Sequence, residues 1–81
     1  MSAYNDRVDV VMANGEVYKD VSARVEKDKI YINSIKIPIA KGTQINRLLK
    51  ENGLLEKYIV TDFYAWRGGS LSHWELSVEK L

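Results

Sequence analysis

Several residue types are absent or rare in this sequence, and each absence excludes a class of protein. There is no cysteine, so disulfides and thiol chemistry are excluded, and we expect a reducing compartment, the cytoplasm. No stretch approaches the roughly 18 apolar residues of a membrane span, and the opening MSAYNDRVDV lacks the apolar segment of a signal peptide. The formal net charge is only +1 and no basic cluster is present, which argues against strong nonspecific binding to nucleic acid.

The residues that are present fit one small folded domain. The 81 residues are 46% hydrophobic and 28% charged, an ordinary balance for a globular protein. No linker, repeat or low-complexity run divides the chain. We therefore expect a single β-rich domain over residues 1–81, near the lower size limit for a chain that folds unaided.

Turn-forming dipeptides divide the first half of the chain into short strands. Asn14-Gly15 is a strong hairpin signal, because both central residues of a type I′ turn need positive φ. Further turns are expected at Lys27-Asp28 and Asn33-Ser34. All three agree on one buried face and predict a four-stranded meander from Arg7 to Ile39, in which Pro38 requires an edge or a break. The expected cross-strand pairs are Val8 with Val21, Val10 with Lys19, Met12 with Val17, Val25 with Ile30, Ala23 with Ile32, Ile32 with Ile35 and Ile30 with Ile37.

The segment Gly42–Gly53 allows two readings. As a helix it has Thr43 as N-cap and Gly53 as its stop. As a strand it leads into an Asn52-Gly53 turn and pairs with Leu55–Val60. Periodicity slightly favours the helix, although one of roughly nine residues would depend on packing. The expected fold is thus an all-β barrel or sandwich of six to eight strands in antiparallel hairpins, or a β-rich α+β fold with one short helix near residues 44–52.

The most aromatic stretch, Tyr58–Val78, predicts a hairpin around Gly68-Gly69. A register centred on the two glycines places Phe63 opposite Trp74, and alternation then separates two faces. The predicted core face carries Ile59, Phe63, Trp74, Leu76 and Val78. The opposite face carries Tyr58, Asp62, Tyr64, Trp66, Leu71, His73 and Glu75.

Four segments contain the turns and strand ends that resemble those of a known family: NGEVYKDVSARVEKDKIYI, IKIPIAKGTQINR, ENGLLEKYIVTDFY and SHWELSVEKL. Together, from Asp6 to Leu81, they resemble a group of small uncharacterised proteins of bacterial genomes and prophages. The sequence departs from that family at Ala40–Thr43, where acidic residues and Gly-Asp are usual, and before Asn52, where proline is common. The resemblance implies the strand–turn–strand reading of Gly42–Val60. A looser likeness in strand order is to phage head–tail joining proteins, small β-barrels that stack in rings; neither likeness implies a reaction.

No combination of residues predicts catalysis, a cofactor or a metal. His73 is the only histidine and, opposite Tyr64, is expected to be a packed residue. Asp62 and Glu75 are expected cross-strand neighbours, but two carboxylates alone make a weak metal site. The Arg67–Ser70 loop has backbone N–H groups that could hold a phosphate, and a plain turn is the favoured reading. We therefore expect no enzyme, no cofactor and no small-molecule substrate.

The aromatic outer face is the candidate binding surface, because exposed apolar patches tend to mark interfaces. Its expected members are Tyr64, Trp66, Arg67, Leu71 and His73. The leading hypothesis is a non-enzymatic assembly or adaptor module that self-associates or binds a protein partner, in the cytoplasm, or in a virion if the protein derives from a phage. The alternative is a single-stranded nucleic-acid-binding barrel, with bases stacked on the aromatic rings and phosphates bound by Arg67 and Arg24. A third possibility is that another part of the barrel covers this face.

Overall fold

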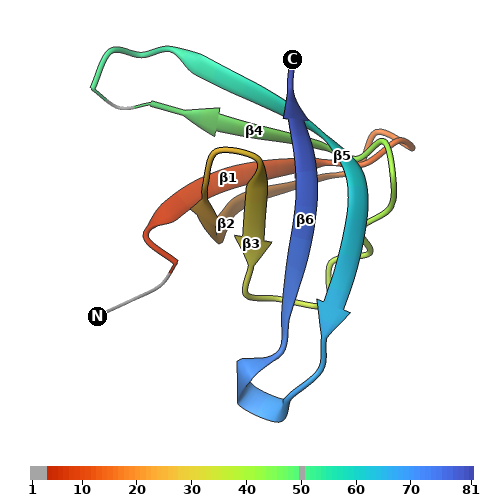
Figure 1. The fold of residues 1–81 in the computed structure, drawn as a ribbon. Helices are drawn as coiled ribbons and strands as arrows, with labels where there is room; N and C mark the ends of the chain where they lie inside the picture. Colours follow the sequence, from red (N-terminus) through yellow and green to blue (C-terminus); the bar gives the residue numbers. More distant parts are fainter. Residues whose placement is uncertain (1–3, 50) are drawn as a thin grey trace.

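The computed structural model describes residues 4–49 and 51–81, which form a closed antiparallel β-barrel (Figure 1). Around the barrel the strands follow the order β1-β2-β3-β6-β5-β4, and β4 closes against β1. The expected all-β fold of antiparallel hairpins is confirmed, and it is a barrel. The strands are β1 (Asp6–Val11), β2 (Val17–Val25), β3 (Lys29–Ile32), β4 (Gln44–Leu48), β5 (Leu55–Trp66) and β6 (His73–Lys80).

The first three strands form hairpins close to those expected from the turns. Val8 lies opposite Val21, and the β2–β3 register pairs Val25 with Ile30, all as predicted. The predicted pairs nearer the Asn14-Gly15 turn are wrong. A register shift between Val8 and Val10 places Val10 opposite Tyr18. As a result the predicted core residue Val17 is 46% exposed.

The predicted fourth strand, residues 35–39, does not exist. After Ile32 the chain leaves the sheet, and β3 pairs with β6 instead, with Ile32 opposite Trp74. Residues 33–43 cross the barrel without pairing as a strand and place Ile37 and Ile39 in the core. The alternation of apolar residues around Pro38 therefore arises because the crossing segment is buried, and it does not indicate a strand. Pro38 lies outside the sheet and removes no hydrogen bond from a ladder.

Residues 44–48 form strand β4, so the helix considered near 44–52 is wrong and the hairpin implied by the family resemblance is correct. Leu48 pairs with Leu55 on β5, and the connection is closed by hydrogen bonds from Leu49 N to Leu54 O and from Gly53 N to Leu49 O, both 2.8 Å. Gly53 has φ of +71°, a conformation that disfavours residues with a Cβ. Tertiary pairing decides this segment, since its local periodicity slightly favours a helix.

Strand β5 contains an irregularity that changes which side chains face inward. Val60 lies opposite Val78, whereas the next pair is Asp62 with Ser77, so Thr61 is an extra residue on β5. Such a bulge exchanges the two faces of a strand, because side chains alternate with period 2. Before it, Tyr58 and Val60 are buried; after it, Tyr64 and Trp66 point outward. The predicted placement of Ile59 in the core and Tyr58 outside is therefore reversed.

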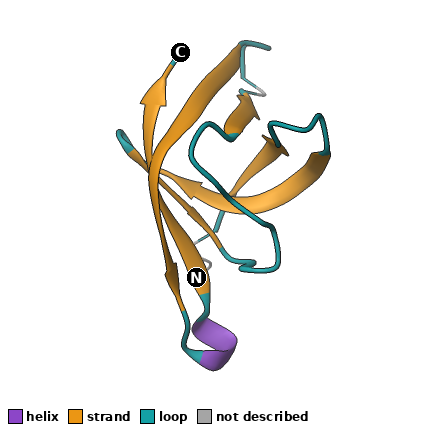
Figure 2. Cartoon of the chain, turned by 90° about the vertical axis from the view of Figure 1, so that its right-hand side faces the viewer, coloured by secondary structure: helices purple, strands orange, loops and turns teal. Residues whose placement is uncertain are grey.

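The β5–β6 connection is longer than the predicted two-glycine turn. A single 3-10 turn, η1 (Gly69–Leu71), lies between the strands, and the hairpin projects beyond the barrel (Figure 2). Trp66 consequently lies opposite His73 and Ala65 opposite Trp74, which differs by two residues from the predicted register. A shift of two keeps each side chain on its face, so Trp74 is buried as expected and Trp66 is exposed. Phe63 still contacts Trp74 edge-on, with ring centroids 5.7 Å apart. It lies opposite Leu76, however, and is 38% exposed, so its predicted place in the core is wrong.

The hydrophobic core is one cluster inside the barrel. Trp74 is its largest side chain, 9% exposed, and its indole Nε1 donates a hydrogen bond of 2.9 Å to the Ile37 carbonyl of the crossing segment. The buried members are Val8, Val10, Ala23, Ile30, Ile32, Ile37, Ile39, Ile45, Tyr58, Val60, Trp74, Leu76 and Val78.

The two tryptophans should differ strongly in their effect on stability. Trp74→Ala removes a buried ring and its bond to Ile37, so we expect a loss of about 3–5 kcal/mol, enough to unfold most molecules of so small a domain. Trp66→Ala removes an exposed ring, and we expect it to change the free energy of unfolding by no more than about 0.5 kcal/mol, as is usual for surface substitutions. Urea denaturation followed by far-ultraviolet circular dichroism measures both. A larger loss for Trp66→Ala than for Trp74→Ala would contradict the placement of the two side chains.

Candidate functional site

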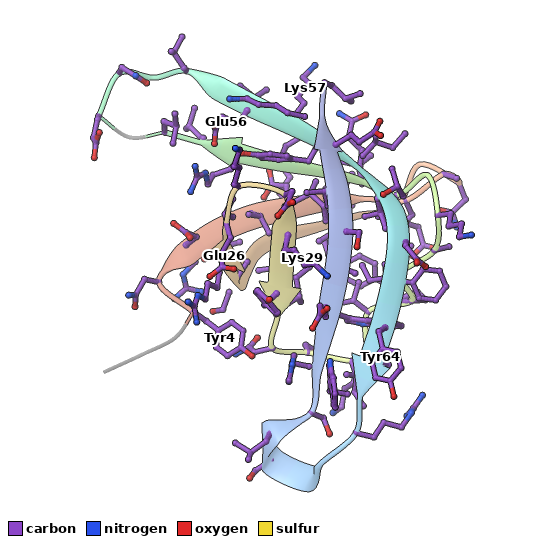
Figure 3. All side chains as sticks on the ribbon, in the orientation of Figure 1. Tyr4, Glu26, Lys29, Glu56, Lys57 and Tyr64 are labelled. Carbon is purple, nitrogen blue, oxygen red and sulfur yellow. The ribbon has the colours of Figure 1, made fainter. Side chains whose placement is uncertain are left out.

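Four aromatic side chains form a continuous row on the outer surface of β3, β6 and β5. The ring of Tyr64 contacts that of Trp66 with centroids 4.9 Å apart, Trp66 stacks on His73 at 6.2 Å, and His73 contacts Tyr31 at 6.3 Å. Figure 3 shows Tyr64 on the outer side of β5. We call Tyr31, His73, Trp66 and Tyr64 the aromatic strip. Tyr64 and Trp66 are 58% and 49% exposed, so no other described part of the chain covers them.

The aromatic strip is held in place by Glu75 of β6. Its carboxylate accepts a hydrogen bond of 2.9 Å from Lys29 Nζ and one of 3.3 Å from Trp66 Nε1. The bond from Lys29 is the main reason that the pKa of Glu75 lies below its ordinary value. Since one carboxylate bonds both residues, the indole of Trp66 is held in one orientation. Figure 3 places Lys29 on β3, next to β6.

The histidine of the strip is tied to the hairpin loop. Nδ1 of His73 lies 2.8 Å from the Leu71 carbonyl. A carbonyl can only accept, so Nδ1 carries the proton in this contact and Nε2 of the neutral ring remains an acceptor. His73 faces Trp66 across the ladder, and the predicted pairing with Tyr64 is wrong. Its expected role as a packed, hydrogen-bonded residue agrees with these contacts.

The charged side chains around the strip are mostly neutralised by neighbours. Arg24 pairs with Glu26 at 2.7 Å and lies 6.0 Å from the centre of the Tyr31 ring, and Lys29 pairs with Glu75. Arg67 is exposed in the β5–β6 loop, and no other described residue forms an ion pair with it. The surface therefore presents aromatic area and little net charge.

The predicted site residues lie together, with two differences in detail. Tyr64, Trp66 and His73 are in the strip, whereas Arg67 and Leu71 lie in the loop that extends beyond it, Leu71 being 78% exposed. The sequence reading did not include Tyr31. Tyr31 joins the strip because β3 pairs with β6, and no turn residues in the sequence predict that pairing.

Other chemistry considered from the sequence finds no support in the geometry. Asp62 lies opposite Ser77, so the predicted Asp62–Glu75 neighbours are wrong. The Gly68 N–H of the loop donates to Ser72 Oγ at 3.0 Å, so it is used within the turn. Within residues 4–49 and 51–81, His, Asp and Glu side chains do not gather in threes at a spacing that holds a metal ion.

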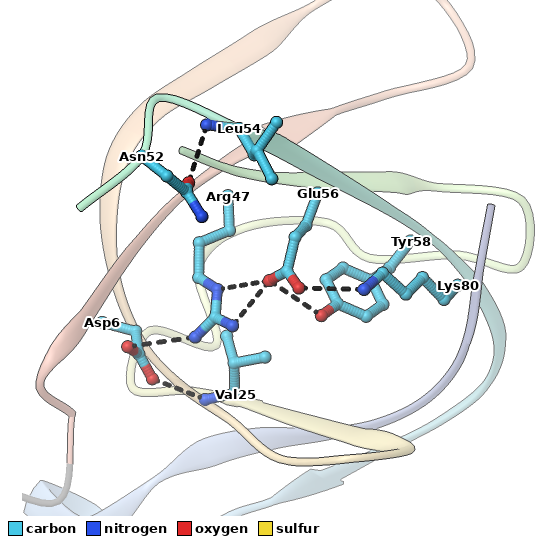
Figure 4. A network of polar contacts seen from close by, with 8 residues as sticks. All are labelled: Asp6, Val25, Arg47, Asn52, Leu54, Glu56, Tyr58 and Lys80. Carbon is cyan, nitrogen blue, oxygen red and sulfur yellow. Dashed lines mark hydrogen bonds and ion pairs between the residues drawn. The ribbon is translucent and has the colours of Figure 1, made fainter. Parts of the chain in front are cut away.

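A polar cluster away from the strip joins residues of five strands, β1, β2, β4, β5 and β6 (Figure 4). Glu56 accepts hydrogen bonds from Lys80 Nζ at 3.0 Å, Arg47 Nε at 2.8 Å and the Tyr58 hydroxyl at 3.1 Å. Arg47 also donates to Asp6, whose second oxygen accepts from Val25 N at 2.9 Å. Charges balance and every carboxylate is bonded, which is the arrangement of a structural network.

The comparisons with known proteins give no match: no family model, no curated protein and no solved structure is similar to this chain. In the described part of the chain, no helix has the length and apolar character needed to cross a membrane.

The polar network predicts acid sensitivity. Hydrogen bonds from Lys80 and then Arg47 lower the pKa of Glu56 from 4.5 to about 2. A carboxylate whose pKa is lower in the folded than in the unfolded chain gives its full stabilisation at pH values above the unfolded-state pKa. That stabilisation is lost as the pH falls toward the folded-state pKa. We therefore expect the free energy of unfolding to fall as the pH drops from about 4.5 to about 2. Urea midpoints measured across this range give the slope.

Glu56→Gln tests whether Glu56 causes the expected loss of stability in acid. At neutral pH it should cost about 1–3 kcal/mol, because Lys80 and Arg47 lose a partly buried charged acceptor, and it should flatten the acid slope. Glu79→Gln, which removes an exposed carboxylate from β6, is the matched control and should leave the slope in place. An unchanged acid slope in Glu56→Gln would show that other carboxylates cause the loss.

Proposed function

We propose that the protein is a non-enzymatic assembly or adaptor module that acts through protein–protein contacts and associates with copies of itself through the aromatic strip. One observation carries the proposal: four rings contact one another in a row on the outer surface of the barrel, and two of them, Tyr64 and Trp66, are 58% and 49% exposed. Strand β4 pairs with β5 only as far as Val60, so residues 61–66 of β5, which include Tyr64 and Trp66, have a ladder partner on the β6 side only. A partner at the strip can therefore meet both the aromatic side chains and this strand edge.

The composition of the strip supports a protein partner. Tryptophan and tyrosine are the residues most enriched among those that dominate binding energy at protein interfaces. Here Trp66 is oriented by Glu75, and Tyr64 is packed against it. Side chains that are already ordered lose little conformational entropy on binding, which favours affinity. Leu71, at 78% exposure, extends the apolar area at the hairpin end.

The likeness to phage head–tail joining proteins, themselves small barrels, gives this proposal a setting in a virion or prophage. That setting stays a prediction, as does the absence of enzymatic activity.

Light scattering across a dilution series tests self-association. We expect a mean mass above the 9.3 kDa of one chain at high concentration, falling toward that value on dilution. Trp66→Ala should raise the dissociation constant at least about tenfold, since truncating an interface hot spot costs about 2 kcal/mol or more. Val17→Thr, an exposed apolar change on β2 away from the strip, is the matched control and should associate like the parent. A parent protein that stays monomeric at every concentration would refute self-association.

A second candidate function, single-stranded nucleic-acid binding, is favoured by the row of rings alone. Bases stack on aromatic side chains at about 1–3 kcal/mol each. The electrostatics oppose it, because Arg24 and Lys29 are already paired with carboxylates. Binding to a backbone of phosphates normally requires cations that displace counterions.

Fluorescence polarisation with a labelled single-stranded oligonucleotide separates the two functions. We expect no binding that strengthens steeply as salt is lowered, because Arg24 and Lys29 are paired with carboxylates and, among the described cationic residues beside the strip, Arg67 alone has no ion-pair partner. Arg67→Gln provides the comparison. Tight, strongly salt-dependent binding that Trp66→Ala abolishes would make nucleic acid the partner in place of protein.

A further inference from the structure

The last residues of strand β5 form an edge that no described strand pairs with. On the β4 side, the final backbone hydrogen bonds belong to Val60, which donates to the Thr43 carbonyl and accepts from Gly42 N–H, both at 2.9 Å. From residue 61 to Trp66, no backbone hydrogen bond within residues 4–49 and 51–81 reaches that side of β5. Every residue of this stretch is exposed except Ala65, which is half-buried, so the edge is open to solvent.

Two residues direct their backbone groups out of this edge. The N–H of Phe63 donates to the carboxylate of Asp62 at 2.9 Å, so it does not point at β6. Backbone groups alternate between the two edges of a strand, and Ala65 therefore also directs its N–H and carbonyl outward, whereas Tyr64 directs its own toward β6. The open edge thus presents the backbone groups of Phe63 and Ala65.

The side chains along this edge are complementary to a second copy of the same edge. In an antiparallel pairing centred on Tyr64, Phe63 of one copy lies opposite Ala65 of the other. The ring of Phe63, which is 38% exposed, then has a small side chain as its neighbour. On the outer face Tyr64 lies opposite Tyr64 of the other copy, and Asp62 lies opposite Trp66, so the two Asp62 carboxylates are kept apart.

We propose that two copies pair antiparallel along residues 62–66 of β5, with a two-fold axis at Tyr64, so that one sheet continues from barrel to barrel. The inference rests on the proposed self-association and specifies its geometry. Phe63 of each copy and Ala65 of the other exchange both N–H···O bonds, as directly opposed residues do in antiparallel ladders. The two aromatic strips become one surface. A two-fold contact uses the same patch on both chains, so assembly ends at two chains.

Asp62 restrains this pairing in the single chain. Its carboxylate holds the Phe63 N–H that the second copy needs, and charged side chains are a common means of limiting strand addition at an edge. Pairing must displace that carboxylate. Asp62→Ala should therefore lower the dissociation constant several-fold, measured by light scattering across a dilution series. An equal or higher dissociation constant would contradict the pairing.

Ala65→Pro tests the backbone pairing without removing an aromatic ring. Proline lacks the N–H that Ala65 directs outward, and edge strands tolerate proline where that group faces solvent, so circular dichroism should report a folded barrel. The parent should reach a limiting mass of twice 9.3 kDa. Ala65→Pro should raise the dissociation constant at least about tenfold, because the two-fold axis repeats the lost hydrogen bond. Ala65→Ser keeps the N–H and is the matched control, expected to associate like the parent.

Hydrogen exchange followed by nuclear magnetic resonance examines the same bond in the parent protein, whatever the stability of the proline variant. The Ala65 amide should be protected at concentrations where two chains associate and should exchange fast on dilution. Equal exchange in both states, or a folded Ala65→Pro that associates as tightly as the parent, would overturn the edge pairing and leave association through the strip intact. A limiting mass above two chains would also overturn it. A parent that is monomeric at every concentration would overturn both proposals and leave the edge for a strand of another protein.

Discussion

The extra residue at Thr61 in strand β5 is the constraint on which the rest of this structure depends. On either side of it the even-numbered residues of β5 change face, so Tyr58 and Val60 fill the barrel while Tyr64 and Trp66 lie outside. An unbroken alternation would put all four on one side. Because of this single bulge, one strand supplies the core at its beginning and the aromatic strip at its end.

The strip also depends on contacts between residues distant in sequence. Tyr31 and Lys29 reach it from β3, and Glu75 bonds Lys29 and Trp66 together. The carboxylate thus joins three neighbouring strands at the surface, as Glu56 does in the polar cluster. In both places a carboxylate with a lowered pKa bonds cations and an aromatic side chain, and the charge is neutralised locally. This leaves aromatic area as the main feature that the outer surface offers.

Much of the fold follows from local sequence signals, and the errors have identifiable causes. Turn residues predict the hairpins at Asn14-Gly15 and Lys27-Asp28, and alternation correctly assigns Trp74 to the core and Trp66 to the surface. No residue pattern in the sequence predicts the bulge at Thr61. The prediction therefore places Ile59 in the core and Tyr58 outside, the reverse of what the structure has. The crossing segment 33–43 is apolar because it is buried, and its pattern imitates a strand. The pairing of β3 with β6, and with it Tyr31, depends on the closure of the whole barrel.

Closure of the barrel has a consequence for how the chain folds. The pairs β1–β2, β2–β3, β4–β5 and β5–β6 join neighbours in sequence, so they can form early as separate hairpins. The β3–β6 and β1–β4 pairs join distant segments, and the Trp74–Ile37 bond fixes the crossing segment between them. Pairing across long sequence separations carries a large loop-closure entropy and slows folding toward milliseconds to seconds. Until the last pairs form, the edges that the native barrel hides remain open to other chains.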